Sequence, residues 1–207
     1  GWTLPAHWVQ LSNGQRFNTC PNASACAAFC YAKNGTYRFK NVLKSHIEKL
    51  ELVLNDLPKF KNLMNAELAK KKYNGKYIRI HDAGDFFSKE YTLAWFDIMQ
   101  SNPSVNFYAY TKEISLFKID LANKIPSNFV LIYSYGGRQD NMIDKDNDRH
   151  SDVFPNYDDM IALGYNDIEP DDKLAAIHPN KKVGLYRNNI AHFIKKMGNK
   201  KFSDYQK

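Results

Sequence analysis

The stretch Tyr77-Ile78-Arg79-Ile80-His81-Asp82-Ala83-Gly84-Asp85 decides the fold that this sequence predicts. Its first five residues form a compact run that is typical of a strand, and the polar segment after them ends the strand abruptly. Ser88 then has the position of a helix N-cap, and Glu90 is available near the start of that helix. The stretch therefore predicts one unit of strand, loop and helix.

The same unit recurs on both sides of this stretch. We expect a first strand, two helices before Asn74-Gly75, two more strands with a helix between them, a less regular region, and a last strand and helix. In order, these predicted elements cover residues 6–11, 39–57, 59–72, 105–110, 114–123, 128–134, 138–172, 183–186 and 189–197. Apolar strands that alternate with amphipathic helices favour parallel βα units.

The predicted fold class is α/β, a partial (βα) barrel with mostly parallel strands. Four or five βα units are too few for a closed eight-stranded barrel. A chain of 207 residues is long enough for one domain with a sizeable core but short for two. We therefore expect a single domain over 1–207, with a cysteine loop at 19–32, core βα units at about 6–137, and an irregular and helical part at 138–207.

The chain is basic, with a formal net charge of +7 and a sequence pI near 9.1. This charge favours anionic partners such as nucleic acid, although a solvated basic face explains it equally well. Lysine-rich stretches at 70–72 and 195–201 look like helix C-termini, where the helix dipole favours cations. The longest apolar run, at 129–133, is far too short to cross a bilayer, so we expect a cytoplasmic protein without a membrane partner.

The only three cysteines, Cys20, Cys26 and Cys30, lie within eleven residues of one another. A cluster this tight predicts a metal site. An odd number of cysteines argues against disulfides, and no nearby histidine completes the usual spacing of a zinc site, although zinc and inert buried thiols remain alternatives. Three thiolates can hold three irons of a [4Fe-4S] cluster and leave the fourth iron open for a small molecule. We favour the iron-sulfur cluster.

Polar residues follow four of the predicted strands, where the loops of parallel βα units converge on one rim. They are the cysteine loop and the segments 82–85, 110–113 and 134–137. His81 borders this rim and could donate or accept a proton. The alternative is that the glycines only permit turns, the acids only cap helices, and the histidine only packs.

The sequence resembles the radical S-adenosylmethionine (radical SAM) iron-sulfur enzymes, which have a partial (βα)6 barrel with a three-cysteine loop after the first strand. More narrowly, it resembles the phage gene product eighty-eight family, over about residues 4–137. The segments that carry this resemblance are Leu4-Pro5-Ala6, Thr19-Cys20-Pro21, Cys26-Ala27-Ala28-Phe29-Cys30-Tyr31-Ala32, His81-Asp82-Ala83-Gly84-Asp85-Phe86 and Tyr110-Thr111-Lys112.

The resemblance implies two cofactors, a [4Fe-4S] cluster on the three cysteines and S-adenosylmethionine on the open iron. It implies reductive cleavage of S-adenosylmethionine, which starts radical modification of an unknown substrate, and a reductant such as flavodoxin or ferredoxin. Phe29 would lie near the adenine, and Gly84 with Asp85 would meet the methionine amine. Thr111, Lys112 and Ser134 would contact the ribose and the carboxylate. The candidate catalytic residues are Asp85, Lys112 and His81.

Two other functions stay open. In the first, the chain binds nucleic acid and the cluster, or zinc, merely holds the loop together. In the second, it is a phage protein that keeps the fold without catalysis and acts by binding a host partner.

Overall fold

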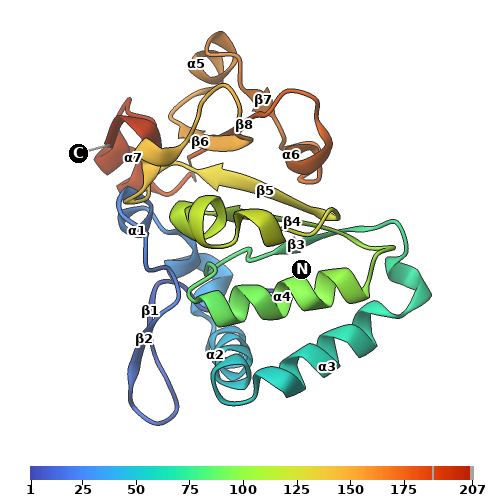
Figure 1. Cartoon of the computed structure of the whole chain (residues 1–207). Helices are drawn as coiled ribbons and strands as arrows, with labels where there is room; N and C mark the ends of the chain where they lie inside the picture. The colour runs from blue at the N-terminus through green and yellow to red at the C-terminus, as the bar shows by residue number, and fades with distance from the viewer. Residues whose placement is uncertain (188, 206–207) are drawn as a thin grey trace. The chain divides into compact units, whose positions relative to one another are not determined.

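The computed structural model describes residues 1–187 and 189–205 (Figure 1). The strands are β1 Trp8–Gln10, β2 Arg16–Asn18, β3 Tyr77–Ile80, β4 Asn106–Thr111, β5 Phe129–Ser134, β6 His150–Phe154, β7 Asn166–Asp167 and β8 Lys182–Tyr186. The α-helices are α1 Ala25–Ala28, α2 Lys40–Asn55, α3 Leu57–Leu68, α4 Lys89–Ser101, α5 Tyr157–Ala162, α6 Leu174–Ile177 and α7 Ala191–Met197. Short 3-10 or π-helical turns are η1 Tyr31–Lys33, η2 Gly35–Arg38, η3 Lys71–Tyr73, η4 Leu116–Asp120, η5 Ala122–Lys124, η6 Asp140–Met142 and η7 Phe202–Tyr205.

The strands form a mixed α/β fold with a six-stranded sheet in the order β3-β4-β5-β6-β8-β7. The pairs β3 with β4, β5 with β6, β6 with β8 and β7 with β8 are parallel. Within the part of the chain that is described, β3 and β7 stand at the two ends of this order, so the sheet is open. The prediction of an α/β fold with mostly parallel strands is therefore confirmed.

The prediction that residues 6–11 form the first strand of the parallel sheet is wrong. The strand β1 pairs antiparallel with β2 in a separate two-stranded sheet. Gly14, with a φ of +84°, permits a tight turn, and the amide of Leu11 donates to the carbonyl of Gln15 at 2.8 Å. A local turn of this kind favours pairing within the hairpin over pairing with a distant strand. The cysteine loop consequently follows the hairpin strand β2.

The predicted strands at 77–81, 105–110, 128–134 and 183–186 are confirmed as β3, β4, β5 and β8, and Ser88 caps α4 by accepting the amide of Tyr91 at 3.2 Å. Helix α2 ends at Asn55, so Pro58 lies in the first turn of α3 instead of ending α2. The predicted helix at 114–123 is instead a π-helical turn and a 3-10 turn, although Ile114, Phe117 and Leu121 are buried.

The region 138–172, predicted to be irregular, contains β6, α5 and β7. Strand β6 carries the polar residues His150, Ser151 and Asp152, all of which are buried. A strand with three buried polar side chains lacks the apolar run or the alternation by which buried strands are recognised. This composition explains why the sequence pattern missed β6.

By its internal contacts the chain divides into two compact units. Unit 1 consists of residues 1–21, 32–109 and 115–130, and unit 2 of residues 22–31, 110–114 and 131–207. In unit 1, α3 packs beside α4 (Figure 1), and the ring centroid of Trp2 lies 4.9 Å from that of Phe60. In unit 2, α5 lies so close to β8 that a Cβ on Gly184 would be 2.6 Å from Cγ of Met160. Each unit thus has a closely packed core.

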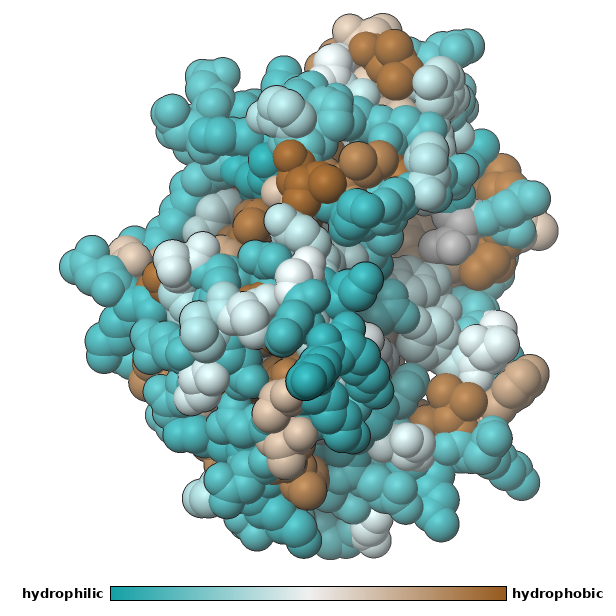
Figure 2. All heavy atoms as spheres, turned by 90° about the vertical axis from the view of Figure 1, so that its right-hand side faces the viewer, coloured by the Kyte–Doolittle hydropathy of each residue, from teal (hydrophilic) through white to brown (hydrophobic). Residues whose placement is uncertain are grey.

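Most large apolar side chains are buried, and the exposed ones are scattered. On the face shown in Figure 2, hydrophobic side chains form small separate groups within a mostly hydrophilic surface. Among the described helices, none combines the length and the apolar character that crossing a membrane requires.

The core of unit 1 generates the first prediction, which concerns Asn128 just before β5. Its side-chain amide donates to the carbonyls of Met99 at 3.0 Å, Asn102 at 3.2 Å and Val105 at 2.9 Å. Asn128→Ala leaves these carbonyls without that donor, so we expect the free energy of unfolding to fall by about 1–3 kcal/mol in urea unfolding. The exposed neighbour Ser127 is the control, because Ser127→Ala should change it by less than about 0.5 kcal/mol. Equal effects of the two variants would contradict the role of Asn128.

Candidate functional site

The cysteine loop begins in unit 1, where backbone hydrogen bonds fix the position of Cys20. The buried Thr19 donates its hydroxyl to the carbonyl of Pro5, and its own carbonyl accepts the amide of Asp85 at 2.9 Å. The amide of Cys20 donates to the side chain of Asn18 at 2.9 Å. The first cysteine is therefore held beside the loop that follows β3.

That loop contains the predicted motif at Gly84 and Asp85. Gly84 has a φ of +84°, and a Cβ there would lie 2.8 Å from Cβ of Leu4. Only glycine fits this close approach without displacing the chain. Asp85 is buried, and its Oδ1 accepts the amide of Phe86 at 2.8 Å. The predicted residues are thus held in a tight, specific turn.

His81, the last predicted candidate of unit 1, is 2% exposed and has a φ of +61°. Its Nε2 lies 2.8 Å from the hydroxyl of Tyr91, which accepts the indole N–H of Trp2 at 3.0 Å. The Tyr91 proton is then available for Nε2, which assigns the ring proton of His81 to Nδ1. Nδ1 is buried, and no hydrogen-bond partner for it lies among residues 1–187 and 189–205. Burial lowers the pKa of His81 to about 3, so the ring is a neutral donor.

The other two cysteines belong to unit 2, where the loop is bound to the turn after β5. The carbonyl of Gly136 accepts the amides of Ser24 and Cys26, both at 3.0 Å, and Ala23 forms an antiparallel bridge with Gly137. Cys26 lies in α1, and Cys30 follows it after Phe29. All three cysteines are half-buried thiols.

A buried carboxylate, Asp140, holds this glycine turn in place. Its Oδ2 accepts the amide of Gly136 and its Oδ1 the amide of Gly137, both at 2.8 Å. Burial raises the pKa of Asp140, while the two amides and the charge of Lys112 act in the opposite direction. Gly136 has a φ of +97°, and a Cβ there would lie 2.8 Å from the ring of Phe202. The turn therefore has no room for a side chain.

The residues that follow β4 meet the same turn. The Lys112 ammonium donates to the hydroxyl of Ser134 at 3.0 Å, which brings two predicted residues into direct contact. The hydroxyl of the buried Thr111 accepts the amide of Glu113 at 3.0 Å, and the Glu113 carboxylate accepts both the amide and the side chain of Asn22. The Thr111 hydroxyl therefore accepts its hydrogen bond from the loop directly after its own strand.

Asp140 was not expected from the sequence, and Glu113 was expected only as part of the segment 110–113; Glu113 anchors the loop and Asp140 the turn. The signal was present in both cases. Glu113 follows the predicted strand end at Tyr110 by three residues and Asp140 follows the one at Ser134 by six, in loops whose unpaired amides need acceptors.

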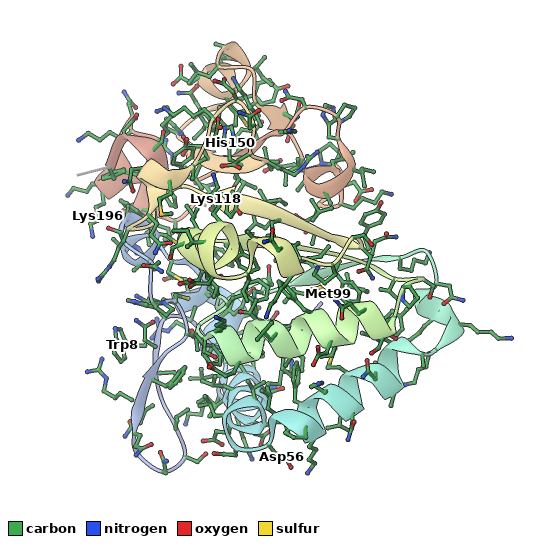
Figure 3. All side chains as sticks on the ribbon, in the orientation of Figure 1. Trp8, Asp56, Met99, Lys118, His150 and Lys196 are labelled. Carbon is green, nitrogen blue, oxygen red and sulfur yellow. The ribbon has the colours of Figure 1, made fainter. Side chains whose placement is uncertain are left out.

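Phe29 is 7% exposed and belongs to an aromatic cluster with the C-terminal segment of unit 2. Its ring centroid lies 5.5 Å from that of Tyr205 and 5.7 Å from that of Phe202, and the ammonium of Lys196, labelled in Figure 3, lies 5.5 Å from it. Ser203 anchors this segment, because its amide and its hydroxyl donate to the buried carboxylate of Asp152. The surroundings of Phe29 are therefore supplied mainly by protein side chains.

The candidate residues fall into two groups. Unit 1 holds Cys20, His81, Gly84 and Asp85, and unit 2 holds Cys26, Phe29, Cys30, Thr111, Lys112 and Ser134. Over residues 1–187 and 189–205, no group of three or more His, Cys, Asp and Glu side chains is arranged so that it could hold a metal ion.

Comparison with known proteins identifies relatives among phage proteins. The profile of a family described as Gene product 88 matches residues 1–204. The chain is 34% identical to the Gene 88 protein of Mycobacterium phage L5 over 137 residues, which cover 62% of this chain and 56% of the relative. It is 36% identical to the Gene 88 protein of Mycobacterium phage D29 over 115 residues, which cover 52% and 48%. The chain thus spans about half the length of these curated relatives, and no solved structure matches it.

The glycine turn generates the second prediction. Gly136→Ala adds a strained φ and a clash with Phe202 and the amide of Cys26, so we expect the free energy of unfolding to fall by about 2–5 kcal/mol. The control is Gly164→Ala, because Gly164 also has a positive φ, +76°, but nothing lies within 4 Å of its added Cβ. It should cost only about 1–2 kcal/mol in the same urea titration. Equal losses would show that the contact with the cysteine loop is unimportant.

The buried histidine generates the third prediction. Because the folded-state pKa of His81 is about 3 and the unfolded value is near 6.5, the unfolded chain binds more protons between these pH values. Stability is therefore lost as the pH falls from 6.5, by about 2 kcal/mol at pH 5. His81→Asn, which also tolerates a positive φ, should lack this component of the pH dependence in urea unfolding at pH 7, 6 and 5. An unchanged pH dependence in the variant would refute the assignment to His81.

Proposed function

The chain belongs to the gene product 88 family, and we propose that it is an iron-sulfur protein that binds a [4Fe-4S] cluster through Cys20, Cys26 and Cys30. We further propose that it binds S-adenosylmethionine and cleaves it reductively to start radical modification of a substrate. The observation that carries this proposal is the way in which hydrogen bonds hold the cysteine loop in place. Backbone hydrogen bonds hold Thr19 at one end and Cys26 at the other, while all three thiols stay half-buried.

The chemical type of the donors supports this proposal, rather than their arrangement among the described residues. Three thiols and no histidine lie on one short loop, and thiolates are the ligands that iron-sulfur clusters take. Buried structural cysteines are inert and packed in the core, whereas these three thiols are only half-buried. A bound cluster of this type, once reduced, supplies the electron that cleaves a sulfonium.

Two of the candidate residues, one in each unit, have the charges that the two ends of an amino-acid ligand require. In unit 2, the Lys112 ammonium, already oriented by Ser134, offers a cation to a carboxylate. In unit 1, the carboxylate of Asp85 offers an anion to an ammonium group, and the tight turn at Gly84 fixes its position. His81 stays neutral and would serve as a hydrogen-bond donor through Nδ1.

The proposal requires an electron donor. A small redox protein such as a flavodoxin or a ferredoxin is the partner that this chemistry calls for. The family model and the phage relatives carry no name for a substrate, so the substrate is left undefined.

Metal analysis tests the proposal and is the fourth prediction. Protein purified without oxygen should contain about four irons and as much sulfide per chain, and S-adenosylmethionine should change the electron paramagnetic resonance spectrum of the reduced protein. Cys20→Ala, Cys26→Ala and Cys30→Ala should each lose the iron, because three ligands are the minimum for the cluster.

Ser24→Ala is the matched control, since Ser24 lies in the same loop with an exposed side chain and no thiol. It should keep the iron of the parent protein. A cysteine variant with full iron content would refute the ligand assignment. Zinc in place of iron would refute the cluster, and an iron spectrum indifferent to S-adenosylmethionine would refute the radical chemistry.

A further inference from the structure

The positive charge of the chain is concentrated in one unit. Unit 1 contains 16 Lys and Arg against 9 Asp and Glu, whereas unit 2 contains 13 of each. The whole formal charge of +7 therefore belongs to unit 1. Within it, residues 33–76 alone carry 11 basic and 4 acidic residues, which again leaves +7. A charge distributed for solubility alone would not be confined in this way.

Some of these basic residues lie at the N-terminal end of α2, where the helix dipole is unfavourable for a positive charge. Arg38 ends η2, and Lys40 and Lys44 lie in the first turns of α2, all three exposed, with no acidic residue in the first turn of the helix. Lys44 pairs with Glu48 at 3.9 Å across an exposed helix surface. Cations stabilise the C-terminal end of a helix and destabilise its N-terminal end. The lysines at the start of α2 therefore do not serve the stability of the helix.

Apolar side chains stand exposed among these cations. Phe39 is 58% exposed and Leu43 39% exposed, between Arg38 and Lys44. An aromatic ring next to basic side chains is the combination with which proteins bind single-stranded nucleic acid, because bases stack on the ring and phosphates pair with the cations.

The β1–β2 hairpin, which is hydrogen-bonded to α2, carries a second aromatic side chain next to a basic one. Ser12 at the hairpin turn donates its amide, at 2.6 Å, and its hydroxyl, at 3.0 Å, to the carboxylate of Glu51 on α2. Trp8 is 52% exposed, its side chain extends away from the hairpin (Figure 3), and the guanidinium of Arg16 lies 5.2 Å from its ring centroid. The hairpin is thus fixed to the helix that carries the basic residues.

We propose that unit 1 binds single-stranded nucleic acid through Arg38, Phe39, Lys40 and Lys44 of η2 and α2, together with Trp8 and Arg16 of the hairpin. The proposal does not depend on a metal at the cysteines, and it assigns unit 1 a partner that the proposed iron-sulfur chemistry does not require.

Fluorescence anisotropy of labelled single-stranded DNA and of RNA of the same sequence tests this proposal over a series of salt concentrations. The triple variant Arg38→Gln, Lys40→Gln, Lys44→Gln should bind at least ~10-fold more weakly, and its plot of log Kd against log salt should be shallower by about two, at ~0.7 per lost phosphate contact. Phe39→Ala should weaken binding about 5-fold or more without changing the salt slope, because it removes stacking and no charge.

The matched control is the triple variant Lys145→Gln, Lys195→Gln, Lys200→Gln, which makes the same change in net charge with exposed lysines of unit 2. It should bind like the parent. Cys26→Ala should also bind like the parent, so that failure of the iron-sulfur proposal and failure of this one are told apart.

Thermal unfolding of each variant shows that it is folded before binding is compared. Stronger binding to RNA or to DNA would identify which nucleic acid is the partner, and either supports the proposal. Three results would overturn it: no salt-dependent binding to either strand, equal weakening by the two triple variants, or binding to phosphatidylserine vesicles without binding to nucleic acid.

Discussion

The carbonyl oxygen of Gly136 accepts two amides of the cysteine loop, and this pair of hydrogen bonds determines where the loop lies in unit 2. The geometry depends on the absence of a side chain at Gly136, because the ring of Phe202 and the backbone of Cys26 occupy the space that a Cβ would need. Asp140 completes the arrangement by accepting the amides of both glycines. Burial raises the pKa of this carboxyl group, and the two amides and the nearby Lys112 compensate only part of the loss of water.

In unit 1, a backbone hydrogen bond and a glycine turn hold the beginning of the cysteine loop in a similar way. The carbonyl of Thr19 accepts the amide of Asp85, and the turn at Gly84 packs directly on Leu4. Backbone hydrogen bonds therefore restrain the chain just before Cys20 and again at Ser24 and Cys26. Restraint of this kind reduces the entropy that a ligand must remove when it binds, so a preorganised loop binds more tightly than a flexible one with the same donors.

The sequence predicted the features that depend on local pattern. The strand that ends at Ile80, the cap at Ser88 and the glycine turn at Gly136 all follow from apolar runs, caps and glycines that are visible in the chain. Prediction from the sequence failed for elements whose structure depends on residues far away along the chain. The first three residues of strand β6 are polar, and His150 and Asp152 among them are hydrogen-bonded by Tyr165 and Ser203 from far along the chain. The hairpin strand β1 was misplaced because alternation reports a strand but not its partner. The roles of Glu113 and Asp140 needed the fold, since only the fold shows which amides they accept.

The two compact units are interleaved along the chain, and this has a consequence for how the protein can be divided. The boundary between them falls after residues 21, 31, 109, 114 and 130, and it cuts through the strands β4 and β5. Residues 1–130 contain all of unit 1, but they also contain the segments 22–31 and 110–114 of unit 2, so no single truncation isolates either unit. A gene fragment that ends between residues 22 and 130 encodes part of both units. The chain also passes from one unit to the other inside the strands β4 and β5, where an insertion has no linker to occupy.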